Sequence, residues 1–316
     1  VSIKELSERF EKEDKNKMEI LWKDDADLFP IMGKSKRFGE MIALEYINKI
    51  EPETEKQFSA ITVILPDNTI YVSYRGTDNT LIGWKEDFNM IFKSHIASQI
   101  SAKEYLENIA KKYPNKKIRI GGHSKGGNLA VYASIFADSE VKKRIINVYN
   151  NDGPGFNEDI INTEEYKKSI EKVITYIPQD SIFGMLLNHE EKYTVVQSTQ
   201  KGVMEHDVYS WQVIGRNFVV LKEVTNGSKF IDKTITNWLK NLDLQTREQV
   251  IDIVFEIINS TEARTIADLK LSLMKNAKII LSSYKHIEPE NKKMITATIT
   301  ALFGIVKENV KEEYKN

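Results

Sequence analysis

The sequence contains no cysteine. This absence excludes disulfide bridges, thiolate catalysis and cysteine-ligated metal sites, so any nucleophile must be an oxygen or an amine. An excess of charge of one sign is also missing, because 45 lysines and arginines nearly balance 46 aspartates and glutamates. Without a strong net field, we expect no nucleic acid or other polyanion as a partner.

Long apolar runs are lacking as well. The opening residues VSIKELSERF carry charges where a secretory signal would be apolar. The longest apolar-leaning run, Met294 to Val306, is far shorter than the roughly 20 residues that span a bilayer. We therefore expect a packed helix at this run and a cytoplasmic location for the protein.

The chain is long enough for one large core and a modest second unit, with 316 residues of which 41% are hydrophobic. We predict an N-terminal arm at residues 1–35, a catalytic unit at 36–231 and a helical appendage at 232–316. Two roles remain open for the appendage: a lid or acyl pocket, or an ordinary packed bundle.

Helices and strands are predicted to alternate in the middle unit, which is typical of a parallel sheet with crossover helices. Spaced apolar residues predict a helix within 36–50, and Thr225-Asn226-Gly227-Ser228 indicates the turn of a hairpin. The other predicted helices cover 2–12, 101–113 and 127–137. The predicted strands cover 58–65, 69–74, 117–120, 145–149, 173–177, 193–197, 218–224 and 229–231.

One motif carries chemistry, Gly122-His123-Ser124-Lys125-Gly126, which fits G-x-S-x-G. It follows a predicted strand and precedes a predicted helix, as a nucleophile elbow requires. The glycines let strand and helix approach closely, while the amide of Lys125 at the helix N-terminus is placed to bind an oxyanion. The alternative is a tight turn in which Ser124 only caps the helix.

A serine hydroxyl needs a base, and three histidines follow Ser124. His206 lies in a loop-like segment after the last predicted parallel strand, which is the usual place of the base. We expect His189, beside two glutamates, to be a solvated surface residue, and His286 falls in the appendage. His206 is therefore the predicted base.

The acid should lie between the serine and the histidine in the sequence. Asp180 follows the predicted strand 173–177, where the chain leaves the sheet at Pro178. Its role would be to orient the imidazole and stabilise the imidazolium. Asp152 is the rival, although an aspartate before Gly-Pro is also typical of a turn.

Several segments together resemble the class 3 (fungal-type) lipases and their uncharacterised bacterial relatives among the α/β-hydrolases. The resemblance spans roughly residues 58–211 and rests on Tyr74-Arg75-Gly76-Thr77, Gly83-Trp84-Lys85-Glu86-Asp87, Gly121 to Ala130, Val173 to Asp180 and Glu205-His206-Asp207-Val208-Tyr209. It implies an α/β-hydrolase fold with a mostly parallel sheet.

The resemblance also implies that Thr77 supplies a second oxyanion donor, through its amide and in addition through its hydroxyl. The alternative for this segment is a hairpin exit with a helix cap at Thr80. Lys125 stands where leucine is usual in the resembling lipases, and its cation would either favour anionic substrates or face solvent.

We therefore predict a lipase-like or esterase-like hydrolase of bacterial lipid metabolism, with the triad Ser124, His206 and Asp180 and no cofactor or metal. Its expected partner is a small-molecule or lipid ester, reached with a transient contact to a membrane surface. The oligomeric state stays open. The alternatives are a thioesterase or acyltransferase with the same triad, and a non-catalytic hydrolase-fold binding module.

Overall fold

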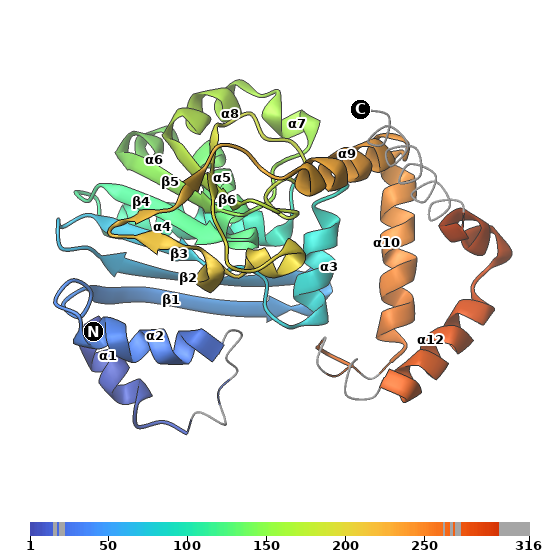
Figure 1. Cartoon of the computed structure of the whole chain (residues 1–316), viewed down its shortest axis with the longest axis horizontal. Coiled ribbons are helices and arrows are strands. Elements are labelled where there is room, and N and C mark those ends of the chain that lie inside the picture. The colour runs from blue at the N-terminus through green and yellow to red at the C-terminus, as the bar shows by residue number, and fades with distance from the viewer. Residues whose placement is uncertain (15–17, 19–22, 262, 266–267, 269–272, 297–316) are drawn as a thin grey trace.

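A computed structural model of the chain describes all residues except 15–17, 19–22, 262, 266–267, 269–272 and 297–316. Its centre is an eight-stranded sheet (Figure 1). In spatial order the strands are β1 (Ile42–Glu51), β2 (Lys56–Ile64), β3 (Ile70–Tyr74), β4 (Ile118–His123), β5 (Ile145–Asn151), β6 (Val173–Pro178), β7 (Tyr193–Val196) and β10 (Val220–Leu221). The strands from β3 to β7 are parallel to one another, and the pairings outside this block are antiparallel. This arrangement confirms the predicted fold class.

Helices connect the parallel strands and extend the fold on two sides of the sheet. α1 and α2 lie beside the edge strand β1, whereas α9, α10 and α12 lie on the right of the view, on the side of α3 (Figure 1). The helices are α1 (Ile3–Phe10), α2 (Lys23–Lys34), α3 (Leu81–Asn89), α4 (Ala97–Lys112), α5 (Lys125–Phe136), α6 (Ser139–Arg144), α7 (Glu158–Ile161), α8 (Glu164–Ser169), α9 (Asn226–Lys240), α10 (Leu244–Asn259) and α12 (Leu273–His286).

The hydrophobic core lies between the parallel strands and the helices α4 and α5, which contact them. Val72 of β3 and Ile120 of β4 are paired in register, and both are fully buried together with Leu129 of α5. Side chains on a strand alternate between its two faces, so these residues fix which face of each strand points inward. The register in turn brings the carboxyl ends of β3 to β6 to one edge of the sheet.

The predicted hairpin around Pro66-Asp67-Asn68 is present as the antiparallel pair β2 and β3. The amide of Leu65 donates to the carbonyl of Thr69 at 2.9 Å, and Asn68 takes the left-handed conformation that asparagine tolerates in turns. Most other predicted elements also form, with shifted ends. The helix predicted at 101–113, for example, is α4 and begins at Ala97.

Three sequence predictions about secondary structure are wrong. The strand predicted at 229–231 lies within the helix α9. Residues 36–50 do not form a helix, because from Ile42 onward the chain pairs with the outer edge of β2 as strand β1. The Thr225-Asn226-Gly227-Ser228 segment is not a hairpin turn, because the hydroxyl of Thr225 accepts a hydrogen bond from the amide of Ser228 and begins α9. The nearby hairpin is formed instead by β8 (Val213–Ile214) and β9 (Asn217–Phe218).

α3 packs between the sheet and α10 (Figure 1). One side of α3 contacts strand β2, and another side contacts α10. Phe88 on its outer face contacts Phe255 of α10, with ring centroids 5.8 Å apart. Trp84 and Phe88 also line an apolar cavity of about 310 Å³ that α9 and α10 complete. The C-terminal helices thus surround a cavity beside α3, and the division of the chain at residue 232 stays a prediction.

The apolar run from Met294 to Val306 falls largely outside the described residues. Among the helices that the structure describes, none is both long and apolar enough to cross a bilayer.

Candidate active site

Ser124 lies on a sharp turn between β4 and α5, as predicted. Its backbone has φ 57° and ψ −133°, a strained conformation for a residue with a side chain. The turn is possible because Gly122 and Gly126 lack side chains: a Cβ on Gly126 would lie 2.2 Å from the carbonyl oxygen of Tyr74. Strand β3, strand β4 and the start of α5 therefore converge behind Ser124.

The Gly126→Ala variant should lower the free energy of unfolding by about 2–3 kcal/mol, since the added methyl group overlaps rigid backbone atoms of Tyr74. Gly227→Ala is the matched control. Its Cβ would meet no atom closer than 3.7 Å, and alanine suits the first turn of α9. Urea midpoints of the two variants measure the difference. Equal midpoints would contradict the close approach described here.

His206 ends a short 3₁₀ turn, η4 (Gly202–His206), near the same edge of the sheet. Its Nδ1 lies 2.7 Å from Oδ2 of Asp152, and the Asp152 side chain is only 1% exposed. The ring of His206 also contacts the ring of His123, the residue before Ser124, with centroids 4.4 Å apart. The fold therefore brings the predicted base next to the predicted elbow.

The carboxylate of Asp152 is held by more than His206. Its Oδ1 accepts hydrogen bonds from the hydroxyl of Ser181 and from the amide of Gly184, the latter at 3.1 Å. Asp152 has φ 52°, and its own amide donates to the carbonyl of Tyr176 on β6 at 2.8 Å. This left-handed residue ends β5 and directs its carboxylate toward His206.

The structure corrects the choice of Asp180 as the acid. The carboxylate of Asp180 accepts hydrogen bonds from the hydroxyl of Thr225 and, at 3.5 Å, from the amide of Gly202. Its amide donates to the buried carboxylate of Glu205 at 2.8 Å. Asp180 thus belongs to the loops that support η4, while Asp152 takes the position beside the imidazole.

Glu205, next to His206 in the sequence, is a supporting residue that the sequence analysis missed. Its side chain is fully buried and accepts hydrogen bonds from the side-chain amide of Gln179 and the backbone of Asp180. Burial raises the pKa of Glu205 to about 7, and the nearby Asp180 adds to the increase. No sequence pattern marks this residue, because its partners come from the loop after β6.

His189 is not the solvated side chain that its neighbours suggested. It is 12% exposed, and its Nδ1 lies 3.1 Å from Oε1 of Glu191. Although burial raises the pKa of Glu191, hydrogen bonds from His189 and from Tyr166 outweigh it and lower that pKa to about 2. This cluster is separate from the pair of His206 and Asp152.

Two amides lie near the nucleophile as candidate oxyanion donors. The amide of Lys125 begins α5, and the first amides of a helix have no partner within it. The segment that contains Thr77 runs along the elbow, since a Cβ on Gly76 would lie 3.3 Å from the Cβ of Ser124. The hydroxyl of Thr77 donates its proton to the carboxylate of Asp87 at 2.5 Å, so this proton points to Asp87. Thr80 caps α3, as the alternative for this segment expected, and the oxyanion role of Thr77 stays a prediction.

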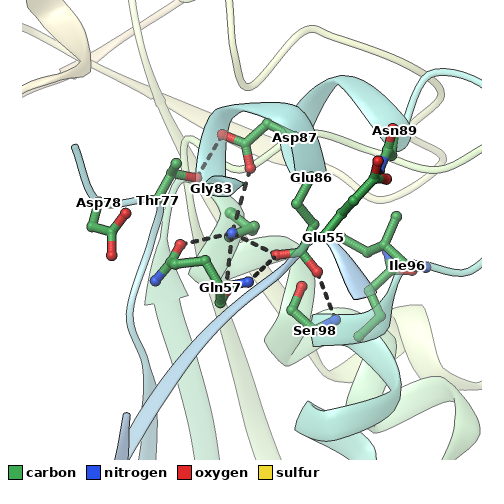
Figure 2. Close-up of polar contacts among 12 residues, drawn as sticks. Glu55, Gln57, Thr77, Asp78, Gly83, Glu86, Asp87, Asn89, Ile96 and Ser98 are labelled. Atoms are coloured by element: carbon green, nitrogen blue, oxygen red, sulfur yellow. Dashed lines mark hydrogen bonds and ion pairs between the residues drawn. The ribbon is translucent and has the colours of Figure 1, made fainter. Parts of the chain in front are cut away.

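The side chain of Lys125 neither faces solvent nor stands beside an oxyanion. It is 1% exposed, and its ammonium contacts Gln57, Glu86 and Asp87. These three partners are labelled in Figure 2. Both roles suggested by the sequence are therefore corrected. The reason is long-range, because these partners come from β2 and α3.

The pKa of His123, the residue before Ser124, is shifted by its surroundings. Burial lowers its pKa to about 4, and proximity to His206 adds to the decrease. Because its pKa is low, the His123 ring is neutral at neutral pH. It therefore does not repel the positive charge that His206 would gain by accepting a proton. In the described part of the chain, including this site, no group of three or more His, Asp or Glu side chains is arranged to hold a metal ion.

A serine on a strained strand-to-helix turn, with a histidine and a buried aspartate at the same edge of a mostly parallel sheet, defines a protein of the α/β-hydrolase fold. The chain belongs to the Mbeg1-like family, whose sequence model matches residues 32–256. Among curated proteins, none matches the sequence.

The chain is similar to several solved lipase structures at low identity. The Rhizomucor miehei lipase propeptide complex is 14% identical, with 63% of this chain and 67% of that chain covered and a TM-score of 0.39. For M37 lipase the identity is 16%, the coverage 58% and 69%, and the TM-score 0.37. For Lip2 lipase from Yarrowia lipolytica the identity is 13%, the coverage 49% and 65%, and the TM-score 0.33. Similarity at this level says nothing of the substrate of this chain.

Proposed function

We propose that the chain is a serine hydrolase that cleaves a carboxylic ester through an acyl-enzyme intermediate. The observation that carries this proposal is the hydrogen bond of 2.7 Å between His206 Nδ1 and the buried Asp152, at the sheet edge where Ser124 occupies its strained turn. A buried carboxylate on one imidazole nitrogen leaves the other nitrogen to act as a base.

In the proposed mechanism, Nε2 of His206 accepts the hydroxyl proton of Ser124 as Oγ attacks the ester carbonyl. Asp152 holds the imidazole in one tautomer and stabilises the imidazolium that forms. The amides of Lys125 and Thr77 donate to the oxyanion, and His206 then passes its proton to the leaving alcohol. Water then attacks the acyl-enzyme and gives its proton to His206. As the bond between the acyl carbon and Oγ breaks, His206 returns this proton to Oγ, which restores Ser124 and releases the carboxylic acid.

The substrate class follows from the resemblance to class 3 lipases, so a lipid ester or a short acyl ester is proposed first. A thioesterase or an acyltransferase would use the same residues. A panel of p-nitrophenyl esters of increasing acyl length, run beside the matching thioesters, separates these activities. Acyl length is a useful variable because an apolar cavity lined by Trp84 and Phe88 lies beside α3 and is one candidate site for an acyl chain.

A fluorophosphonate probe tests the proposal directly. We expect the folded protein to be labelled at Ser124, as located by peptide mass spectrometry, because an activated serine attacks the phosphorus atom. The His206→Ala variant lacks the base and should be labelled far more slowly, and heat-denatured protein is the control for nonspecific reaction. A folded wild-type protein that remains unlabelled would favour the non-catalytic binding module instead.

A further inference from the structure

The buried ammonium of Lys125 joins the proposed nucleophile helix to the Thr77 segment. It donates to the backbone oxygen and to Oε1 of Gln57 at 3.1 and 2.8 Å, and to Oε2 of Glu86 at 2.9 Å. An ammonium has three protons, so these contacts account for all of its donors. Oδ1 of Asp87 lies 3.6 Å away, within the same charged cluster. The side chain of Lys125 is therefore held in one position.

Further hydrogen bonds also hold the acidic partners of Lys125 in position. Glu86 is 1% exposed and also accepts hydrogen bonds from the amides of Gln57 and Ser98, at 3.0 and 2.8 Å. Figure 2 shows Gln57 from one side and Glu86 and Asp87 from α3 pointing toward a common centre. Two neighbouring carboxylates on one helix thus share one buried cation.

Asp87 connects this cluster to the proposed oxyanion hole. Its Oδ2 accepts the hydroxyl proton of Thr77 at 2.5 Å (Figure 2). Burial raises the pKa of Asp87 to about 6, and Lys125 acts in the opposite direction. Lys125 therefore favours the ionised form of Asp87, which is the stronger acceptor for the Thr77 hydroxyl.

We propose that Lys125 is a positioning residue for the oxyanion hole. Through Glu86 and Asp87, its side chain holds the amides of residues 125 and 77 in a fixed position relative to each other. This inference rests on the proposed hydrolase function. The contribution is indirect, because the ammonium is buried away from the substrate side and touches no reacting atom. Without it, Glu86 and Asp87 would repel each other in the interior, and Asp87 would release Thr77.

The test compares Lys125→Met with Lys85→Met. The first variant keeps the backbone amide of residue 125 and the length of the side chain but removes the buried charge. The second removes another buried ammonium from the same region, and Lys85 pairs with Asp252 and Glu55 on the outer side of α3. Both variants are assayed for ester turnover and for inhibition by an aryl boronic acid, whose tetrahedral adduct places an oxygen in the oxyanion hole.

We expect Lys125→Met to lower kcat by about 10²-fold, with KM little changed, because misplaced oxyanion donors weaken binding of the transition state only. The boronic acid should lose affinity in parallel. Lys85→Met should retain both values. Unchanged kcat in folded Lys125→Met, or a rise in KM alone, would overturn the inference.

If Lys125→Met fails to fold, the double variant Lys125→Met/Glu86→Gln removes the charge imbalance and takes its place. A lower kcat in that variant supports the inference, and wild-type kcat overturns it. The proposed function is judged separately, on the wild-type protein: absence of turnover and of labelling at Ser124 would reject the hydrolase itself.

Discussion

The Ser124→Ala variant should lose ester turnover by a factor on the order of 10⁶ while its fold stays intact. The reason is that the hydroxyl is the proposed nucleophile, and removal of a triad serine leaves only what binding and the oxyanion hole provide, about 10³–10⁴ over water. Alanine also lacks the atoms that form the acyl-enzyme, so a burst of p-nitrophenol should be absent.

Turnover of a p-nitrophenyl ester, followed at substrate saturation, measures this loss. Ser181→Ala is a suitable contrast, since the Ser181 hydroxyl donates to the carboxylate of Asp152 and accepts from the amide of Gly184, and it has no proposed role in the reaction. We expect a much smaller decrease in that variant. If Ser124→Ala kept most of the wild-type activity, the assignment of the nucleophile would be wrong.

The Asp152→Asn variant should show a kcat lowered by about 10⁴-fold at neutral pH. An amide at this position is able to present its NH₂ group to Nδ1 of His206, which favours the wrong imidazole tautomer and removes the charge that stabilises the imidazolium. The side chain keeps its size, so the buried site between Ser181 and Gly184 need not rearrange.

Asp180→Asn is the matched control for this prediction, because it makes the same chemical change one strand away. Its side chain contacts Thr225 and Gly202 instead of His206, so we expect a small effect on kcat and a modest loss of stability. The measurement is the kcat of each variant, and thermal unfolding confirms that both variants are folded. A larger loss in Asp180→Asn than in Asp152→Asn would reverse the identification of the acid.

The elbow could be predicted because its signal is local. Glycines at 122 and 126, a short strand before and a small-residue helix after are all encoded within about twenty consecutive residues, and the structure shows each of them. The parallel sheet was predictable for a similar reason, since alternating strand and helix patterns leave few topologies open.

The acid could not be chosen from the sequence because two aspartates follow two adjacent strands. Which of them meets His206 depends on the register of β5 against β6 and on the left-handed turn at Asp152, where the chain hydrogen bonds to Tyr176. Neither feature has a local signature. An aspartate before glycine and proline indicates a turn whether or not its carboxylate has a chemical role.

Long-range partners explain the other errors. Residues 42–50 carry spaced apolar side chains that suit a helix, yet the free edge of β2 binds them as a strand. The sequence suggested that Lys125 either favours anionic substrates or faces solvent, because its true partners Gln57 and Glu86 lie far from it in the sequence. Tertiary contacts of this kind override local preference wherever they bury a group completely.

The two faces of α3 connect the C-terminal helices with the proposed chemistry. Asp87 accepts a hydrogen bond from Thr77, and the next residue, Phe88, points in a different direction and packs against Phe255 of α10. An aromatic contact with the last third of the chain therefore lies one residue along α3 from the side chain that binds the Thr77 hydroxyl.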